Sequence, residues 1–158
     1  MTEEQQNKID DCIGQLKKIS EWVEHNKINS LTKCMNEYGV ILACGSIEFL
    51  MKDIFYEKLA EGTAEEVKAI IRTQTKDNHS NPNLTYLGTL LKLKKEWADT
   101  YKLESKTLEK SKQDLGSLCS LRNTIAHGNP MTTNITEIQN YYESAIKLLE
   151  LVCDIIYR

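Results

Sequence analysis

Apolar residues recur at helical spacing along almost the whole chain. Thr2-x-x-Gln5, a pattern of the capping-box type, opens a segment that ends near Asn26. Its apolar positions are Ile9, Ile13, Leu16, Ile19 and Val23. Spacings of three and four residues place such positions on one face of a helix, whereas a half-buried strand would alternate apolar and polar residues. Because no segment shows that alternation, the pattern predicts an all-α fold.

The same pattern predicts a bundle of about five to six helices. The second should be long and central, capped by Asn29 or Ser30 and stopped at Gly62, and Thr63-x-x-Glu66 should cap the third. The lysine-rich stretch before residue 115 is either an exposed connection or a helix start. The expected helices span about 3–26, 30–62, 63–72, 84–97, 115–127 and 135–157.

Composition fits one helical domain over residues 1–158. The 158 residues are 41% hydrophobic, with a net charge of −3, so we expect a core large enough to fold unaided. The amino terminus lacks the basic region followed by an apolar region that is typical of a signal peptide. No apolar stretch is long enough to span a membrane. Four of the five cysteines sit among apolar residues, which is typical of buried, reduced thiols. These features predict a cytoplasmic protein without a membrane segment.

The sequence excludes several kinds of enzyme. It contains no GxxxxGK[ST], GxGxxG, HExxH or GxSxG pattern, so nothing predicts a metal, a nucleotide cofactor or a serine nucleophile. The slightly acidic net charge also argues against binding nucleic acid by bulk electrostatics. Any RNA-binding surface should therefore be a local patch.

The helix before Gly128 carries the most informative residues. Arg122 falls within its apolar stripe, one turn after Leu118, and such a guanidinium needs a partner or a route to solvent. The opposite face is small, polar and uncharged, unlike a solvated helix face. We therefore expect it to meet another surface, such as a second copy of the chain. The members of this face are Gly116, Ser120, Asn123 and His127, flanked by Ser117 and Thr124.

Two further expectations concern Arg122. Glu48 is the only charged residue between Tyr38 and Met51, so it is the candidate partner of Arg122, with a solvent-exposed Glu48 as the alternative. On a regular helix Arg122 and His127 stand about 140° apart. Fraying of the last turn, or contributions from two subunits, would be needed to bring them together.

Gly45 and Gly116 lie inside helical patterns, which predicts that a neighbouring helix approaches them closely.

These residues carry a resemblance to a known family. The run Arg122-Asn-Thr-Ile-Ala-His127-Gly resembles the Arg-x4-His signature of the HEPN superfamily (higher eukaryotes and prokaryotes nucleotide-binding domains). The stretch GSIEFLMKDIF around Glu48 is similar to the second helix of stand-alone bacterial HEPN groups, and a hydrophobic helix follows the motif. The resemblance implies a HEPN-like bundle with the motif at the end of the penultimate helix.

The resemblance also implies an activity. It suggests a homodimeric, metal-independent endoribonuclease that cleaves RNA by attack of the 2′-hydroxyl, in a toxin, phage-defence or RNA-processing role. His127 would be the general acid or base, Arg122 would hold the scissile phosphate, and Asn123 would orient the site. Partners would be the RNA substrate, a second copy and an antitoxin or other regulatory protein. The alternatives are a catalytically inactive HEPN-like module that binds a nucleotide or protein, and an unrelated helical interaction module.

Overall fold

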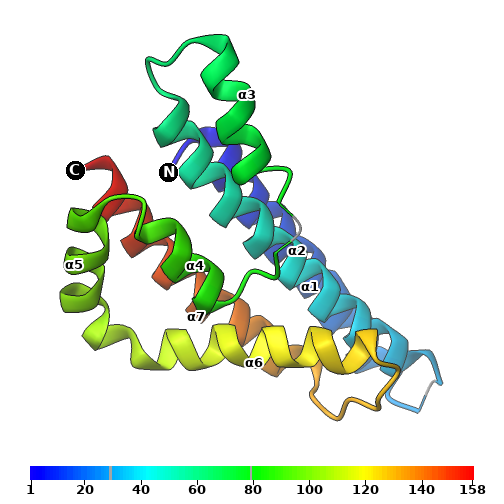
Figure 1. Ribbon diagram of the computed structural model, residues 1–158. Helices are drawn as coiled ribbons and strands as arrows, with labels where there is room; N and C mark the ends of the chain where they lie inside the picture. The colour runs from blue at the N-terminus through cyan, green and yellow to red at the C-terminus, as the bar shows by residue number, and fades with distance from the viewer. Residues whose placement is uncertain (29, 79) are drawn as a thin grey trace.

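The computed structural model describes residues 1–28, 30–78 and 80–158, and helices are its only regular elements. This confirms the all-α prediction. Figure 1 shows the helices in chain order. They are α1 (Glu3–His25), α2 (Leu31–Ala60), α3 (Glu65–Gln74), α4 (Leu84–Leu91), α5 (Lys95–Glu104), the short 3₁₀ helix η1 (Ser105–Leu108), α6 (Glu109–Ala126) and α7 (Ile135–Tyr157).

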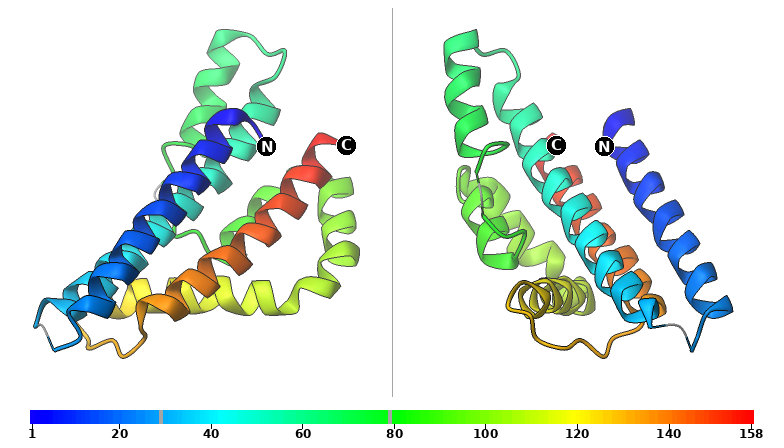
Figure 2. Two further views of the ribbon diagram at one scale, coloured as in Figure 1. Left: turned by 180° about the vertical axis from the view of Figure 1, so that it is seen from behind. Right: turned by 90° about the vertical axis from the view of Figure 1, so that its right-hand side faces the viewer.

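The three longest helices form the body of the molecule. α1 and α2 run antiparallel, α7 packs against both, and α6 crosses beneath them, so both chain ends lie at the same end of the bundle (Figures 1 and 2). α2 is the central element, as expected. Val40, Ile47, Leu50 and Ile54 are 0% exposed, because α1, α7 and α6 cover different sides of the helix. The motif-bearing helix α6 is the penultimate one and is held against both α2 and α7.

Local signals set most helix ends. Thr2 and Gln5 form the expected capping box at α1, and Asn134 and Glu137 form a second one at α7. α6 ends in a Schellman motif: Gly128 has a φ of 69°, and its N–H donates to the carbonyl of Ile125 at 2.9 Å. The expected position of Gly128 just after the helix is therefore confirmed.

Some helix boundaries differ from the prediction. The helix expected over 84–97 is two helices, because the chain turns at 92–94 and redirects the next segment so that Trp97 packs edge-on against Phe55 of α2 at 6.0 Å. Thr63 does not cap α3, since its hydroxyl donates to the carbonyl of Ala60 at 2.9 Å and the helix starts later. The lysine-rich stretch is mostly helical, with η1 joining α5 to α6. Ser30 occupies the N-cap position of α2 without a side-chain cap, and Asn29 lies outside the described residues.

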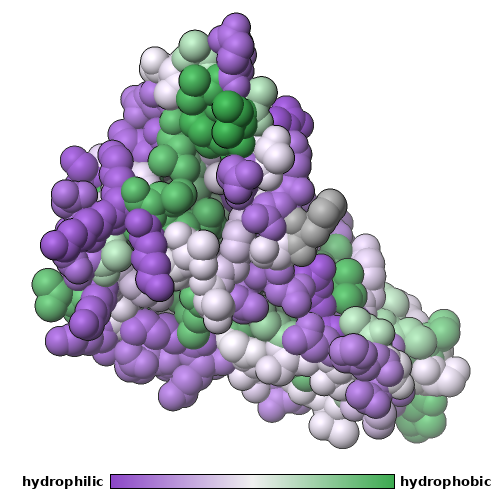
Figure 3. All heavy atoms as spheres, in the orientation of Figure 1, coloured by the Kyte–Doolittle hydropathy of each residue, from purple (hydrophilic) through white to green (hydrophobic). Residues whose placement is uncertain are grey.

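α3 packs on α2 and leaves much of its apolar face in solvent. The helix has no buried residue, and Ile70 and Val67 are 65% and 44% exposed. Figure 3 shows the resulting green area over α3 at the top of the molecule. Along 1–28, 30–78 and 80–158, no helix combines the length and apolar character needed to cross a membrane.

The glycine prediction was wrong, and the cysteine prediction holds for four of five. A Cβ on Gly45 or Gly116 would meet nothing within 4 Å, whereas one on Gly39 would lie 2.6 Å from Cδ1 of Ile135. The close helix approach is thus at Gly39, where α7 crosses α2. All cysteines are free, and only Cys34 is exposed.

Candidate functional site

Arg122 lies on the side of α6 that faces α2. Its side chain is 33% exposed, and neighbouring Leu118 is fully buried, so the stem covers the core while the guanidinium reaches the edge of the bundle. Nη1 lies 3.4 Å from Oε2 of Glu48 on α2 and donates a hydrogen bond of 2.9 Å to Oδ1 of Asn81. The pairing predicted between Arg122 and Glu48 is confirmed.

Glu48 is shared between two cations. Its Oε1 lies 2.7 Å from Nζ of Lys52, one turn further along α2, while Oε2 faces Arg122. The Glu48 side chain is 23% exposed and that of Lys52 only 11%, so the carboxylate is not the freely exposed group of the alternative interpretation. One carboxylate between an ammonium and a guanidinium leaves a formal charge of +1, which favours an anion at the exposed side of the cluster.

Both contacts of the Arg122 guanidinium use the same nitrogen. Nε and Nη2 donate no hydrogen bond to any residue that the structure describes. An Nε–Nη2 edge presents two parallel N–H groups at the spacing of two phosphate oxygens, which allows a bidentate contact. The arrangement therefore fixes one corner of the guanidinium and leaves its phosphate-binding edge available.

His127 stands apart from Arg122 in the single chain. It is the C-cap residue of α6, it is exposed, and its backbone N–H donates to the carbonyl of Asn123 at 3.0 Å. α6 thus keeps its regular winding up to the imidazole, and fraying does not swing His127 round to Arg122. Asn123 is also exposed on α6, away from the Glu48 side. One chain therefore gathers Arg122 and Glu48 but not Asn123 or His127.

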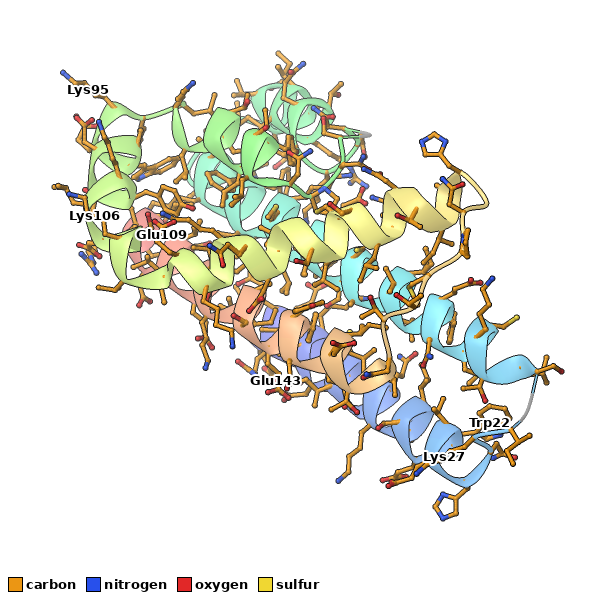
Figure 4. All side chains as sticks on the ribbon, turned by 90° about the horizontal axis from the view of Figure 1, so that it is seen from below. Trp22, Lys27, Lys95, Lys106, Glu109 and Glu143 are labelled. Carbon is orange, nitrogen blue, oxygen red and sulfur yellow. The ribbon has the colours of Figure 1, made fainter. Side chains whose placement is uncertain are left out.

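The small, polar face of α6 borders a shallow hollow. Two members of the expected face, Gly116 and Ser120, and both flanking residues, Ser117 and Thr124, line it together with Tyr141 of α7, whereas Asn123 and His127 do not. Figure 4 views α6 and α7 from below, with Glu109 at the start of α6 and Glu143 on α7. Since nothing lies within 4 Å of a Cβ on Gly116, this part of α6 is open to a partner surface.

Two thiols lie close to the Arg122 cluster and are protonated. Burial raises the pKa of Cys44 to about 12, and Cys44 donates to the carbonyl of Leu118 at 3.4 Å. Burial also raises the pKa of Cys119, although nearby Arg122 partly opposes this. A thiol that keeps its proton is a poor nucleophile. We therefore assign these cysteines to packing and to helix contacts.

The sequence interpretation missed two members of the cluster, Lys52 and Asn81. The signal for Lys52 was available, because it follows Glu48 by four residues and such pairs face each other on a helix. Asn81 had no such signal. It lies in the segment between α3 and α4, and only the tertiary fold brings it to α6.

Comparisons with known proteins identify one family. The family model described as RiboL-PSP-HEPN matches residues 2–158, nearly the full chain. No curated protein matches the sequence. No solved structure matches it either.

Proposed function

Because the chain belongs to the RiboL-PSP-HEPN family of the HEPN superfamily, we propose that it is a metal-independent endoribonuclease acting on single-stranded RNA. The observation that carries this proposal is the partly exposed Arg122 guanidinium, which is held through Nη1 while Nε and Nη2 donate no hydrogen bond to any described residue. The net positive Lys52–Glu48–Arg122 cluster supplies the local patch that a chain of charge −3 needs to bind a phosphodiester.

The proposed reaction uses the RNA as its own nucleophile. The 2′-hydroxyl oxygen forms a bond to phosphorus while an imidazole of His127 takes its proton, and the P–O5′ bond breaks as a protonated imidazole supplies a proton to O5′. Arg122 binds the non-bridging oxygens, whose negative charge grows in the transition state. The products are a 2′,3′-cyclic phosphate and a 5′-hydroxyl. Asn123, which follows Arg122 in the sequence and is exposed on another side of α6, orients the site.

We further propose that the working site is formed by two copies of the chain. In one chain Arg122 faces α2 while His127 lies exposed at the end of α6, so the two groups do not meet. Apposition of two α6 helices through the hollow beside Gly116 and Ser120 would bring the His127 ends of both helices to one cleft, with the Arg122 guanidinium groups at its border. An antitoxin or other regulatory protein would then act by covering that cleft, in a toxin, phage-defence or RNA-processing role.

The test is cleavage of end-labelled single-stranded RNA in EDTA. The parent protein should cleave, and His127→Ala should be slower by roughly 10²–10⁴-fold with unchanged helicity, because a general acid–base group is lost. His25→Ala is the matched control, since His25 is also an exposed imidazole at a helix end and should leave the rate unchanged.

The products and the failure mode are equally diagnostic. New 5′ ends should accept phosphate from a polynucleotide kinase without prior dephosphorylation, as a 5′-hydroxyl does. Products with 5′-phosphates, or a rate that EDTA abolishes, would contradict the mechanism. RNA binding without cleavage by the parent protein would instead identify the chain as a catalytically inactive HEPN-like binding module.

A further inference from the structure

We propose that Asn81 is a positioning residue that sets the orientation of the Arg122 guanidinium, an inference that rests on the proposed ribonuclease function. Its Oδ1 accepts a hydrogen bond of 2.9 Å from Nη1 of Arg122, which is shorter than the 3.4 Å separation between that nitrogen and Glu48. Asn81 lies outside the Arg-x4-His segment and comes to it from the chain between α3 and α4.

The backbone on the carboxyl side of Asn81 is anchored. The carbonyl of Pro82 accepts a hydrogen bond of 3.3 Å from Sγ of Cys119, one turn before Arg122 on α6. Asn83 caps α4 by accepting from the N–H of Tyr86 at 2.9 Å, and its own N–H donates to the carbonyl of Asn81 at 2.8 Å. Figure 1 shows α4, which begins just after Asn83, above α6. Asn81 is thus presented to Arg122 from a fixed point.

Chemistry fixes which end of the amide meets the guanidinium. A guanidinium has only donors, so the Asn81 oxygen must face Arg122 and the amide nitrogen must face away. A contact to Glu48 alone would leave the guanidinium free to turn about its Cδ–Nε and Nε–Cζ bonds. Nη1 has one hydrogen-bond acceptor, Asn81 from the α3–α4 segment, and one ion-pair partner, Glu48 from α2, and together they restrict the plane of the group. That plane determines where the Nε–Nη2 edge points.

The first test uses NMR and requires no activity. The chain has three arginines, so ¹⁵N-arginine labelling gives a simple side-chain spectrum, in which Arg122→Lys assigns the Arg122 signals. Arg158, held by Glu104 through two contacts of 2.6 and 3.0 Å, is the internal reference for a restrained guanidinium. Asn81→Ala should release the Arg122 group, so that its separate Nη signals merge, while those of Arg158 stay unchanged. Unchanged Arg122 signals would overturn the proposal.

The second test separates positioning from direct RNA contact. Asn81→Ala should lower kcat roughly ten- to a hundredfold with KM unchanged, because a misplaced catalytic group acts on the transition state. Asn81→Asp keeps the acceptor, so it should restore both kcat and the Arg122 signals, although its charge should raise KM at low salt. Thr85 is exposed and lines a polar surface hollow that Asn81 also lines, so Thr85→Ala is the matched control and should alter neither kcat nor the Arg122 signals.

The outcomes distinguish this proposal from the proposed function. A rise in KM at constant kcat in Asn81→Ala would show that Asn81 binds RNA itself and would overturn the positioning role. If the parent protein cleaves no RNA, the ribonuclease proposal fails, and the NMR comparison still decides whether Asn81 holds Arg122.

Discussion

Replacing Glu48 by Gln should destabilise the fold mainly through Lys52. The substitution keeps the size of the side chain but removes the charge 2.7 Å from Nζ of Lys52, whose side chain is only 11% exposed. The ammonium would then stay buried without its counter-charge. Arg122 loses less, because it is 33% exposed and keeps its bond to Asn81.

The magnitude follows from this partial burial. Removing one partner of a fully buried pair costs about 3–5 kcal/mol, and losing an exposed pair costs about 0–1 kcal/mol. Because Glu48 is 23% exposed, water reaches one side of the pair and lowers the cost. We expect Glu48→Gln to reduce the free energy of unfolding by about 2–3 kcal/mol.

Urea denaturation at neutral pH measures this loss, with Glu65→Gln as the matched control. The Lys68–Glu65 pair has the same 2.7 Å separation, but the Glu65 side chain is 85% exposed, so its loss should change stability by less than about 0.5 kcal/mol. Adding Lys52→Met to Glu48→Gln should recover part of the stability, because the uncompensated charge disappears. Two results would refute the reasoning: equal losses of stability in Glu48→Gln and Glu65→Gln, or additive effects of Glu48→Gln and Lys52→Met.

Three further predictions concern other parts of the chain. Ser120→Glu should weaken dimerisation at micromolar concentration in light scattering, because it places a charge on the small face of α6; a strictly monomeric parent protein would remove the two-subunit site. Gly45→Ala should raise stability by about 0.5–1 kcal/mol through helix propensity. Gly39→Ala should raise stability less than Gly45→Ala does, because the side chain of Ile135 must move. Equal increases in stability would contradict the described packing. Stability should fall above pH 9, because unfolded Cys44 loses its proton near 9 whereas burial raises its folded pKa to about 12. Cys44→Ala should make stability fall less steeply with pH, whereas Cys34→Ser, at an exposed cysteine, should not. The same slope of stability against pH in both variants would contradict this prediction.

The sequence by itself determined the features that depend on neighbouring residues. Helical periodicity gave the all-α class, and the capping box at Thr2 and the stop at Gly128 follow from side chains and backbone angles within a few positions. One long-range contact, the Arg122–Glu48 pair, was also predictable, since each is a charge within an apolar stretch and its burial requires a partner.

Tertiary structure alone decided the other features that depend on distant segments. The chain turns between α4 and α5 and places Trp97 against Phe55 of α2, and the close approach falls at Gly39 because Ile135 of α7 lies there. Asn81 reaches Arg122 across 41 positions of chain, and turn chemistry in its own segment says nothing about that partner. Periodicity reports which face of a helix is buried, whereas which residues meet on that face depends on how the helices cross.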